Sequence, residues 1–212
     1  NRRKEHAPMV GSRTGRITGV ATGPEPGTAD YPKLRSLKMS SIPANPPSEA
    51  GQCLETLATP CLVLDRDRMD RNVTRLRGRL AQLGPELRPH LKTCKSPEAA
   101  RRVMTTAAGP ATVSTLKEAE EFAAAGVTDI TYAVGITPDK LDRVLALRGA
   151  GVDLAVTLDT VVQAQVVAEA SRRAGAAIPA LIEIDCDGHR SGVLPHDRER
   201  LLAIAGALTE AG

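Results

Sequence analysis

The chain has 212 residues, enough for one domain with a substantial core, and its 42% hydrophobic and 25% charged residues are ordinary for a globular protein. Its only aromatic residues are Tyr31, Phe122 and Tyr132, which argues against a surface that stacks nucleic-acid bases. No apolar run approaches a membrane span, and the first thirty residues lack the apolar segment of a secretory leader. We therefore expect neither nucleic-acid nor membrane partners.

The formal net charge of +3 is unevenly distributed along the chain. Residues 1–40 hold eight Lys or Arg against three acidic residues, so the remainder is close to neutral. Residues 1–52 are rich in Pro, Gly, Ser and Thr and show no sustained period of 2 or 3.6, which predicts a disordered, solvated tail or sequence outside the domain. A contact between this basic tail and nucleic acid or acidic lipid is the alternative. The ordered domain is expected over 57–212.

The four cysteines show neither a Cys-x-x-Cys pair nor the spacing of a zinc site. They are Cys53, Cys61, Cys94 and Cys186. Free thiols in the reducing cytoplasm are the expected state.

From residue 59 onward, short apolar segments alternate with amphipathic ones. A strand is expected at 59–64, and a helix follows it with an apolar stripe at steps of 4 and 3 that ends before Gly84. Further strands are expected at 87–92, 111–114, 129–134, 153–158 and 180–185. Helix-start signals follow these strands at Ser96-Pro97, Thr115-Leu116-Lys117-Glu118, Thr137-Pro138, Thr160 and Pro195.

Strands that alternate with helices predict an α/β fold with a parallel sheet. A doubly wound sheet and a (β/α)8 barrel of the TIM type both fit the alternation. The dinucleotide fingerprint Gly-x-Gly-x-x-Gly follows none of the expected strands, which weakens the doubly wound alternative. A complete barrel needs about 250 residues, so we expect a partial barrel of about five βα units.

Lys92 ends the strand expected at 87–92 and directly precedes a capped helix. Residues that end barrel strands face the catalytic mouth, where partial desolvation lowers the pKa of a lysine and frees its amine for attack on an aldehyde. Lys92 is therefore a candidate for a Schiff base with pyridoxal 5'-phosphate (PLP), with a plain surface lysine as the alternative. His90 lies on the same strand face and could orient the cofactor, transfer a proton or simply line the barrel.

A second polar segment, Glu183 to Gly192, ends the strand expected at 180–185. Arg190 offers a permanent planar charge for a phenolic oxygen of the cofactor or for a substrate carboxylate. His189 is a candidate acid–base group, with a solvent-exposed side chain as the alternative. Asp185 and Asp187 have no third metal ligand nearby, so we interpret them as loop-shaping residues.

Four segments together resemble the fold-type III PLP enzymes, whose N-terminal domain is a barrel of the alanine racemase type. The segments are Thr59 to Asp65, Arg88 to Ser96, Thr112 to Glu120, and Glu183 to Gly192. Within that group the chain most resembles the D-threonine aldolase and D-serine dehydratase-like branch, from about residue 57 to its end. The resemblance places the Schiff-base lysine on Lys92, the first lysine after the Pro-His pair, and the arginine near the PLP phenolic oxygen on Arg190.

The resemblance implies a PLP-dependent lyase that acts on β-hydroxy D-amino acids. It would cleave them to glycine and an aldehyde, or remove water and ammonia. It also implies a homodimer and a divalent metal, whose ligands would lie in a C-terminal β-domain that the sequence does not contain. The alternatives are a non-catalytic PLP-binding homeostasis protein, an amino-acid racemase of the same fold, and an inactive truncated relative.

Barrel strands six to eight are also missing, and the chain begins without Met. We therefore expect a truncated product with part of a cofactor site, no metal site and little activity alone.

Overall fold

The computed structural model describes residues 53–209, so the tail expected over 1–52 lies outside the described residues. Its helical elements are η1 (Leu54–Thr56), α1 (Arg66–Leu83), α2 (Pro97–Val103), α3 (Leu116–Ala124), η2 (Pro138–Lys140), α4 (Leu141–Gly149), α5 (Val161–Ala174) and α6 (Arg198–Thr209). Its strands are β1 (Ala111–Val113), β2 (Asp129–Gly135), β3 (Asp153–Leu158) and β4 (Ala180–Ile182). No helix between residues 53 and 209 is long and apolar enough to cross a bilayer.

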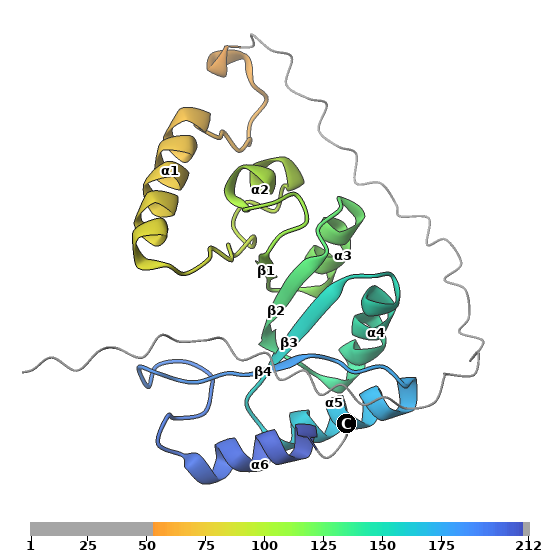
Figure 1. Cartoon of the computed structure of the whole chain (residues 1–212). Helices are drawn as coiled ribbons and strands as arrows, with labels where there is room; N and C mark the ends of the chain where they lie inside the picture. The colour runs from red at the N-terminus through yellow and green to blue at the C-terminus, as the bar shows by residue number, and fades with distance from the viewer. Residues whose placement is uncertain (1–52, 210–212) are drawn as a thin grey trace, which may run out of the picture.

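The strands form one parallel sheet in the order β1-β2-β3-β4 (Figure 1). Each strand is followed by a helix before the next parallel strand begins, because parallel neighbours need a crossover connection. Sequential order without a reversal is the arrangement of a barrel wall. The expected α/β class, with part of a TIM-type barrel, is confirmed.

The helices begin and end where local side chains satisfy the free backbone groups. The Ser96 side chain accepts the Ala99 N–H at the start of α2, and α5 begins with a capping box between Thr160 and Gln163. Helix α1 ends at Gly84, whose φ of 89° places it in the left-handed region that favours glycine. These local signals explain why the helix positions could be predicted closely.

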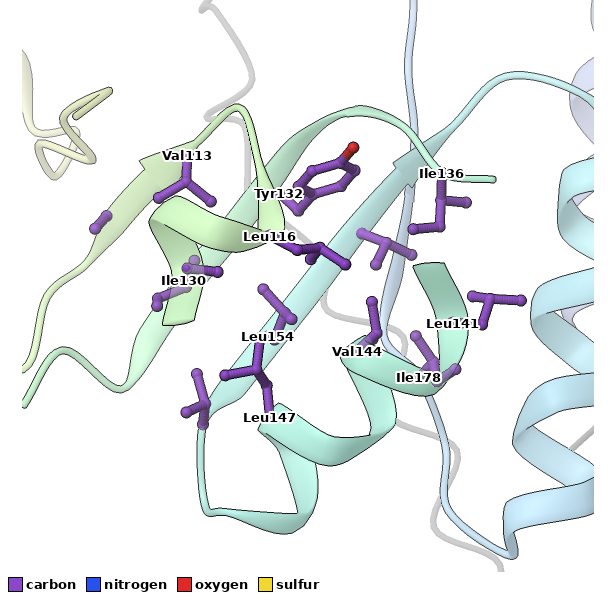
Figure 2. Packing of buried hydrophobic residues seen from close by; sticks show 14 of the residues in the cluster. Val113, Leu116, Ile130, Tyr132, Ile136, Leu141, Val144, Leu147, Leu154 and Ile178 are labelled. Atoms are coloured by element: carbon purple, nitrogen blue, oxygen red, sulfur yellow. The ribbon is translucent and has the colours of Figure 1, made fainter. Parts of the chain in front are cut away.

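The main core lies between one face of the sheet and the helices that cover it. Side chains at alternate positions of β2 and β3 are fully buried there, including Ile130, Tyr132 and Leu154. Figure 2 shows these residues beside the buried side chains of α3 and α4, and they belong to one continuous cluster. Burial of this apolar face fixes which side of each strand turns toward the helices.

Two expected strands do not form regular strands. Residues 59–64 form no strand in the described part of the chain, and Leu62, Val63 and Leu64 are exposed. The segment 87–92 is reduced to one parallel bridge between His90 and Thr112. An apolar run becomes a strand only where a neighbour pairs with its backbone groups, and that neighbour is not a property of the run itself.

Candidate active site

The sheet face opposite the covering helices carries short side chains. In parallel register His90 pairs with Thr112, Thr112 with Thr131, and Thr131 with Ala155. Directly paired residues share one face of a sheet, so these four form a row across it, and all four are half-buried. Barrel interiors are usually filled by bulky branched residues. Three of the four residues in this row, Thr112, Thr131 and Ala155, have short side chains instead.

Lys92 stands in the turn 91–94, directly beyond the edge of the sheet at which the parallel strands end. The turn is anchored by Leu91, which is fully buried and donates its N–H to the Thr112 carbonyl at 2.8 Å. The Lys95 N–H then donates to the Leu91 carbonyl at 3.0 Å and closes the turn. The exposed Lys92 is therefore carried by an anchored backbone at the edge where the strands end.

The two neighbouring lysines differ in their surroundings. Lys95 adopts φ of 43°, and its Nζ lies 3.5 Å from Oε1 of Glu118, whose side chain is only 10% exposed. Among the described residues, the side chain of Lys92 makes neither a hydrogen bond nor an ion pair. An ammonium group held by a buried carboxylate is a poor nucleophile, because it must lose a proton and a partner to react. The surroundings favour Lys92 over Lys95 as the reactive amine.

His90 is held at both ring nitrogens. Its Nδ1 accepts the Lys92 backbone N–H at 3.3 Å, and its Nε2 lies 3.3 Å from Oγ of Ser114. Burial is the main cause that lowers the pKa of His90, and the positive charge of Lys92 lowers it further, while Glu118 opposes the shift. The ring is therefore favoured in its neutral form beside the candidate amine.

Ser114 and Glu118 were not recognised as site residues from the sequence. Ser114 directly follows β1, and its backbone N–H donates to Oε2 of Glu118 at 2.8 Å. In a capping box the Glu118 side chain would accept the backbone N–H of Thr115. Here it accepts the backbone N–H of Ser114, one residue earlier. The signal that could have found Ser114 is its position, because consecutive parallel strands end at a shared edge.

The second candidate segment follows β4, which ends at the same edge of the parallel sheet. His189 and Arg190 lie there in an exposed loop. Among the described residues, no hydrogen bond or ion pair joins either side chain to Lys92 or His90. The structure thus brings His90 and Lys92 together, and within residues 53–209 it shows no hydrogen bond or ion pair from His189 or Arg190 to them.

The loop is shaped by carboxylates that accept backbone N–H groups. Oδ1 of Asp185 accepts from Gly188 at 2.9 Å, and Oδ1 of Asp187 accepts from His189 at 3.2 Å. Burial acts to raise the pKa of Asp185, but the N–H groups of Gly188 and Asp187 outweigh burial and lower it. The loop-shaping role expected for both aspartates agrees with these contacts. Within residues 53–209, no three His, Cys, Asp or Glu side chains gather in a way that could hold a metal ion.

Comparison with known proteins identifies relatives over the same residues. The family described as alanine racemase, N-terminal domain, matches residues 64–211, more than half of the chain. D-threo-3-hydroxyaspartate dehydratase of Delftia sp. (strain HT23) is 49% identical over 159 residues, which are 75% of this chain and 42% of the relative. D-threonine aldolase of Arthrobacter sp. is 32% identical over 161 residues, 76% of this chain and 42% of the relative. The chain thus spans about two fifths of the length of these curated relatives.

Solved structures agree with the sequence matches. The Delftia sp. HT23 dehydratase superposes with a TM-score of 0.71 over 74% of this chain and 41% of its own, at 49% identity. D-threonine aldolase from Filomicrobium marinum superposes with a TM-score of 0.60 over 73% of this chain and 40% of its own, at 31% identity. Together with the motifs around Lys92 and Arg190, these findings confirm the resemblance seen in the sequence. The chain belongs to the alanine racemase N-terminal domain family of fold-type III proteins.

Proposed function

We propose that this chain supplies the lysine-bearing part of a PLP-dependent lyase that acts on β-hydroxy D-amino acids. The observation that carries the proposal is the exposed amine of Lys92, which has no described side-chain partner and whose backbone N–H donates to the His90 ring at the carboxyl edge of the sheet. The names of the relatives, a dehydratase and aldolases, favour a lyase over a racemase or a homeostasis protein.

The residues present fit PLP in three respects. Lys92 offers an amine for the aldehyde, and a flat ring could lie against the short side chains of Thr112, Thr131 and Ala155. Arg190 offers a permanent positive charge for the phenolic oxygen or a substrate carboxylate. When bound, PLP would act as an electron sink for a carbanion at the amino acid α-carbon. The chain's own contribution is to bind, orient and charge-balance the reactants.

The substrate class we propose is an acidic β-hydroxy D-amino acid, of which D-threo-3-hydroxyaspartate is the first to test. Its choice rests on the 49% identity to the Delftia dehydratase. Dehydration would eliminate water, which is taken up again when the resulting enamine is hydrolysed, so its net products would be ammonia and a 2-oxo acid. Cleavage would release glycine and an aldehyde, so the products separate the two activities. One solved form of that dehydratase is described as metal-free, which supports a metal in that relative. For this protein we propose that the metal ligands, if present, come from outside residues 53–209.

We also propose where the protein acts, how it assembles and which part of the barrel it forms. The protein would act in the cytoplasm, where its unpaired cysteines remain reduced. It would form a homodimer, and residues 57–212 would be the incomplete N-terminal part of the barrel. Barrel closure would come from strands that these residues do not include.

The test compares two lysine variants of the protein after incubation with PLP. Wild type and Lys95→Ala are expected to show an imine band at about 420 nm, whereas Lys92→Ala loses it, because Lys95 is ion-paired with Glu118 and the Lys92 side chain has no such partner among the described residues. Borohydride reduction and peptide mapping should place the added mass on Lys92. An undiminished band in Lys92→Ala, or added mass on Lys95, would remove the assignment.

The activity test uses the same three proteins. Ammonia release from D-threo-3-hydroxyaspartate, but not from its L enantiomer, is expected for wild type and Lys95→Ala. Glycine plus an aldehyde instead of ammonia would identify an aldolase. Absence of both products from a protein that carries the imine would contradict the lyase proposal.

A further inference from the structure

The two contacts of the His90 ring determine where its proton lies. A backbone N–H can only donate, so Nδ1, which accepts from the N–H of Lys92 at 3.3 Å, carries no hydrogen. The neutral ring then has its hydrogen on Nε2, which points at Oγ of Ser114, 3.3 Å away. Both ring nitrogens are thereby engaged, one as an acceptor and one as a donor.

The surroundings oppose a second proton on this ring. A proton on Nδ1 would face the Lys92 N–H and break that bond, and the Lys92 ammonium lies on the same turn. The negative charge that faces His90 is Glu118, but this carboxylate is engaged by the Ser114 N–H and by Lys95. A ring bonded at both nitrogens has neither a free acceptor nor a free donor to offer a substrate.

We propose that His90 is a positioning residue, which holds the backbone of Lys92 through Nδ1 while its Nε2–H donates to Ser114, and that His90 does not carry a proton in the reaction. This inference rests on the proposed function of Lys92 and extends it. Of the roles open to His90 from the sequence, orientation or proton transfer, the contacts select orientation. They also assign Ser114, which the sequence did not single out, as the acceptor of the Nε2 hydrogen.

Two amide substitutions separate the two ends of the ring. In His90→Asn the oxygen can occupy the place of Nδ1 and accept the N–H two residues on, as asparagine does in Asx turns. In His90→Gln the amide lies one bond further out, near the place of Nε2, so it can reach Ser114 but not reproduce the bond to Lys92. Neither side chain titrates, so both variants would remove a proton carrier equally.

The inference predicts that His90→Asn retains imine formation and turnover to within roughly threefold. Turnover of His90→Gln and His90→Ala should fall roughly fivefold or more, because each variant loses the hydrogen bond to the Lys92 N–H. The pH profile of kcat/KM should be the same in wild type and His90→Asn. Losses of roughly 100-fold or more in both amide variants, the weight of a lost acid–base group, together with a missing limb of the pH profile, would overturn the proposal.

Two readouts do not depend on the cofactor. Nitrogen NMR of the histidine rings, assigned by the signal that disappears in His90→Asn, should show hydrogen on Nε2 and none on Nδ1 at neutral pH. Amide exchange at Lys92 should be slow in wild type and His90→Asn and faster in His90→Gln. Hydrogen on Nδ1, or equal exchange in all variants, would overturn the inference. If wild type forms no imine while both readouts hold, the proposed function fails and the positioning of Lys92 stands.

Discussion

Gly192 shows how a single residue closes the loop that carries Arg190. Its φ of 121° lies in the region that favours glycine, and an added Cβ would lie 2.6 Å from the Asp185 nitrogen and 2.8 Å from the Ile184 carbonyl carbon. Its N–H donates to Oδ2 of Asp159 at 3.0 Å, which ties the loop to the end of β3. The position therefore has neither the backbone freedom nor the space for a side chain.

We expect Gly192→Ala to lower the free energy of unfolding by about 2–3 kcal/mol, because strain and a backbone clash add together. Gly188→Ala is the matched control in the same loop. Gly188 also has a positive φ, of 73°, but an added Cβ would meet nothing within 4 Å, so its loss should be about 1 kcal/mol. Urea denaturation measures both. An equal or smaller effect at Gly192 would show that the loop backbone moves to accommodate the methyl group.

At the scale of elements, the central strand β3 shows how the sheet is packed. It lies between β2 and β4, and Leu154, Val156 and Leu158 face the helices with no exposed surface. The outer strands β1 and β4 are only three residues long. Like β2, β3 is paired on both sides and covered on one face, so its side chains contribute to both the ladder and the core.

Leu154→Ala is expected to lower the free energy of unfolding by about 2–5 kcal/mol, since it leaves a cavity in a close-packed region. Leu202→Ala in α6 is the control, because Leu202 is 59% exposed, and its effect should stay within about 0.5 kcal/mol. Thermal or urea unfolding of the two variants decides the point. Similar losses in both would mean that the sheet–helix core is not the main source of stability.

The stability of the whole molecule should depend on pH in two separate ranges. The folded pKa of His90 lies below the ordinary histidine pKa of 6.5, so the unfolded chain binds more protons as the pH falls through 6.5. The contribution of His90 to the free energy of unfolding is therefore present above pH 6.5 and is lost as the pH falls from 6.5 to the folded pKa. The folded pKa of Asp185 is likewise depressed, and its contribution is lost only as the pH falls below the unfolded value near 3.8.

Urea midpoints measured from pH 7.5 to 5 should therefore fall in wild type and fall less in His90→Asn. Asp185→Asn should leave the slope in that range unchanged and should reduce the loss only below about pH 4. A slope in His90→Asn as steep as that of wild type would assign the acid sensitivity to other groups.

The sequence by itself determined the helices, their caps and the alternation that implies a parallel sheet. Ser96, Thr160 and Gly84 act within a few residues of their own helices, so the neighbouring residues in the sequence are enough to predict their effects. The motif around Lys92 was also recognisable as a pattern. The strand expected at 59–64 was wrong because its apolar run carries no information about a pairing partner.

Only the tertiary structure decided what surrounds each side chain of the site. It paired Lys95 with Glu118 of α3, left the side chain of Lys92 without a described partner, and placed Ser114 against the ring of His90. These contacts join the turn after one expected strand to the end of the next strand and the start of its helix. Such proximity arises from the parallel register of the sheet, a long-range property that local sequence patterns do not encode.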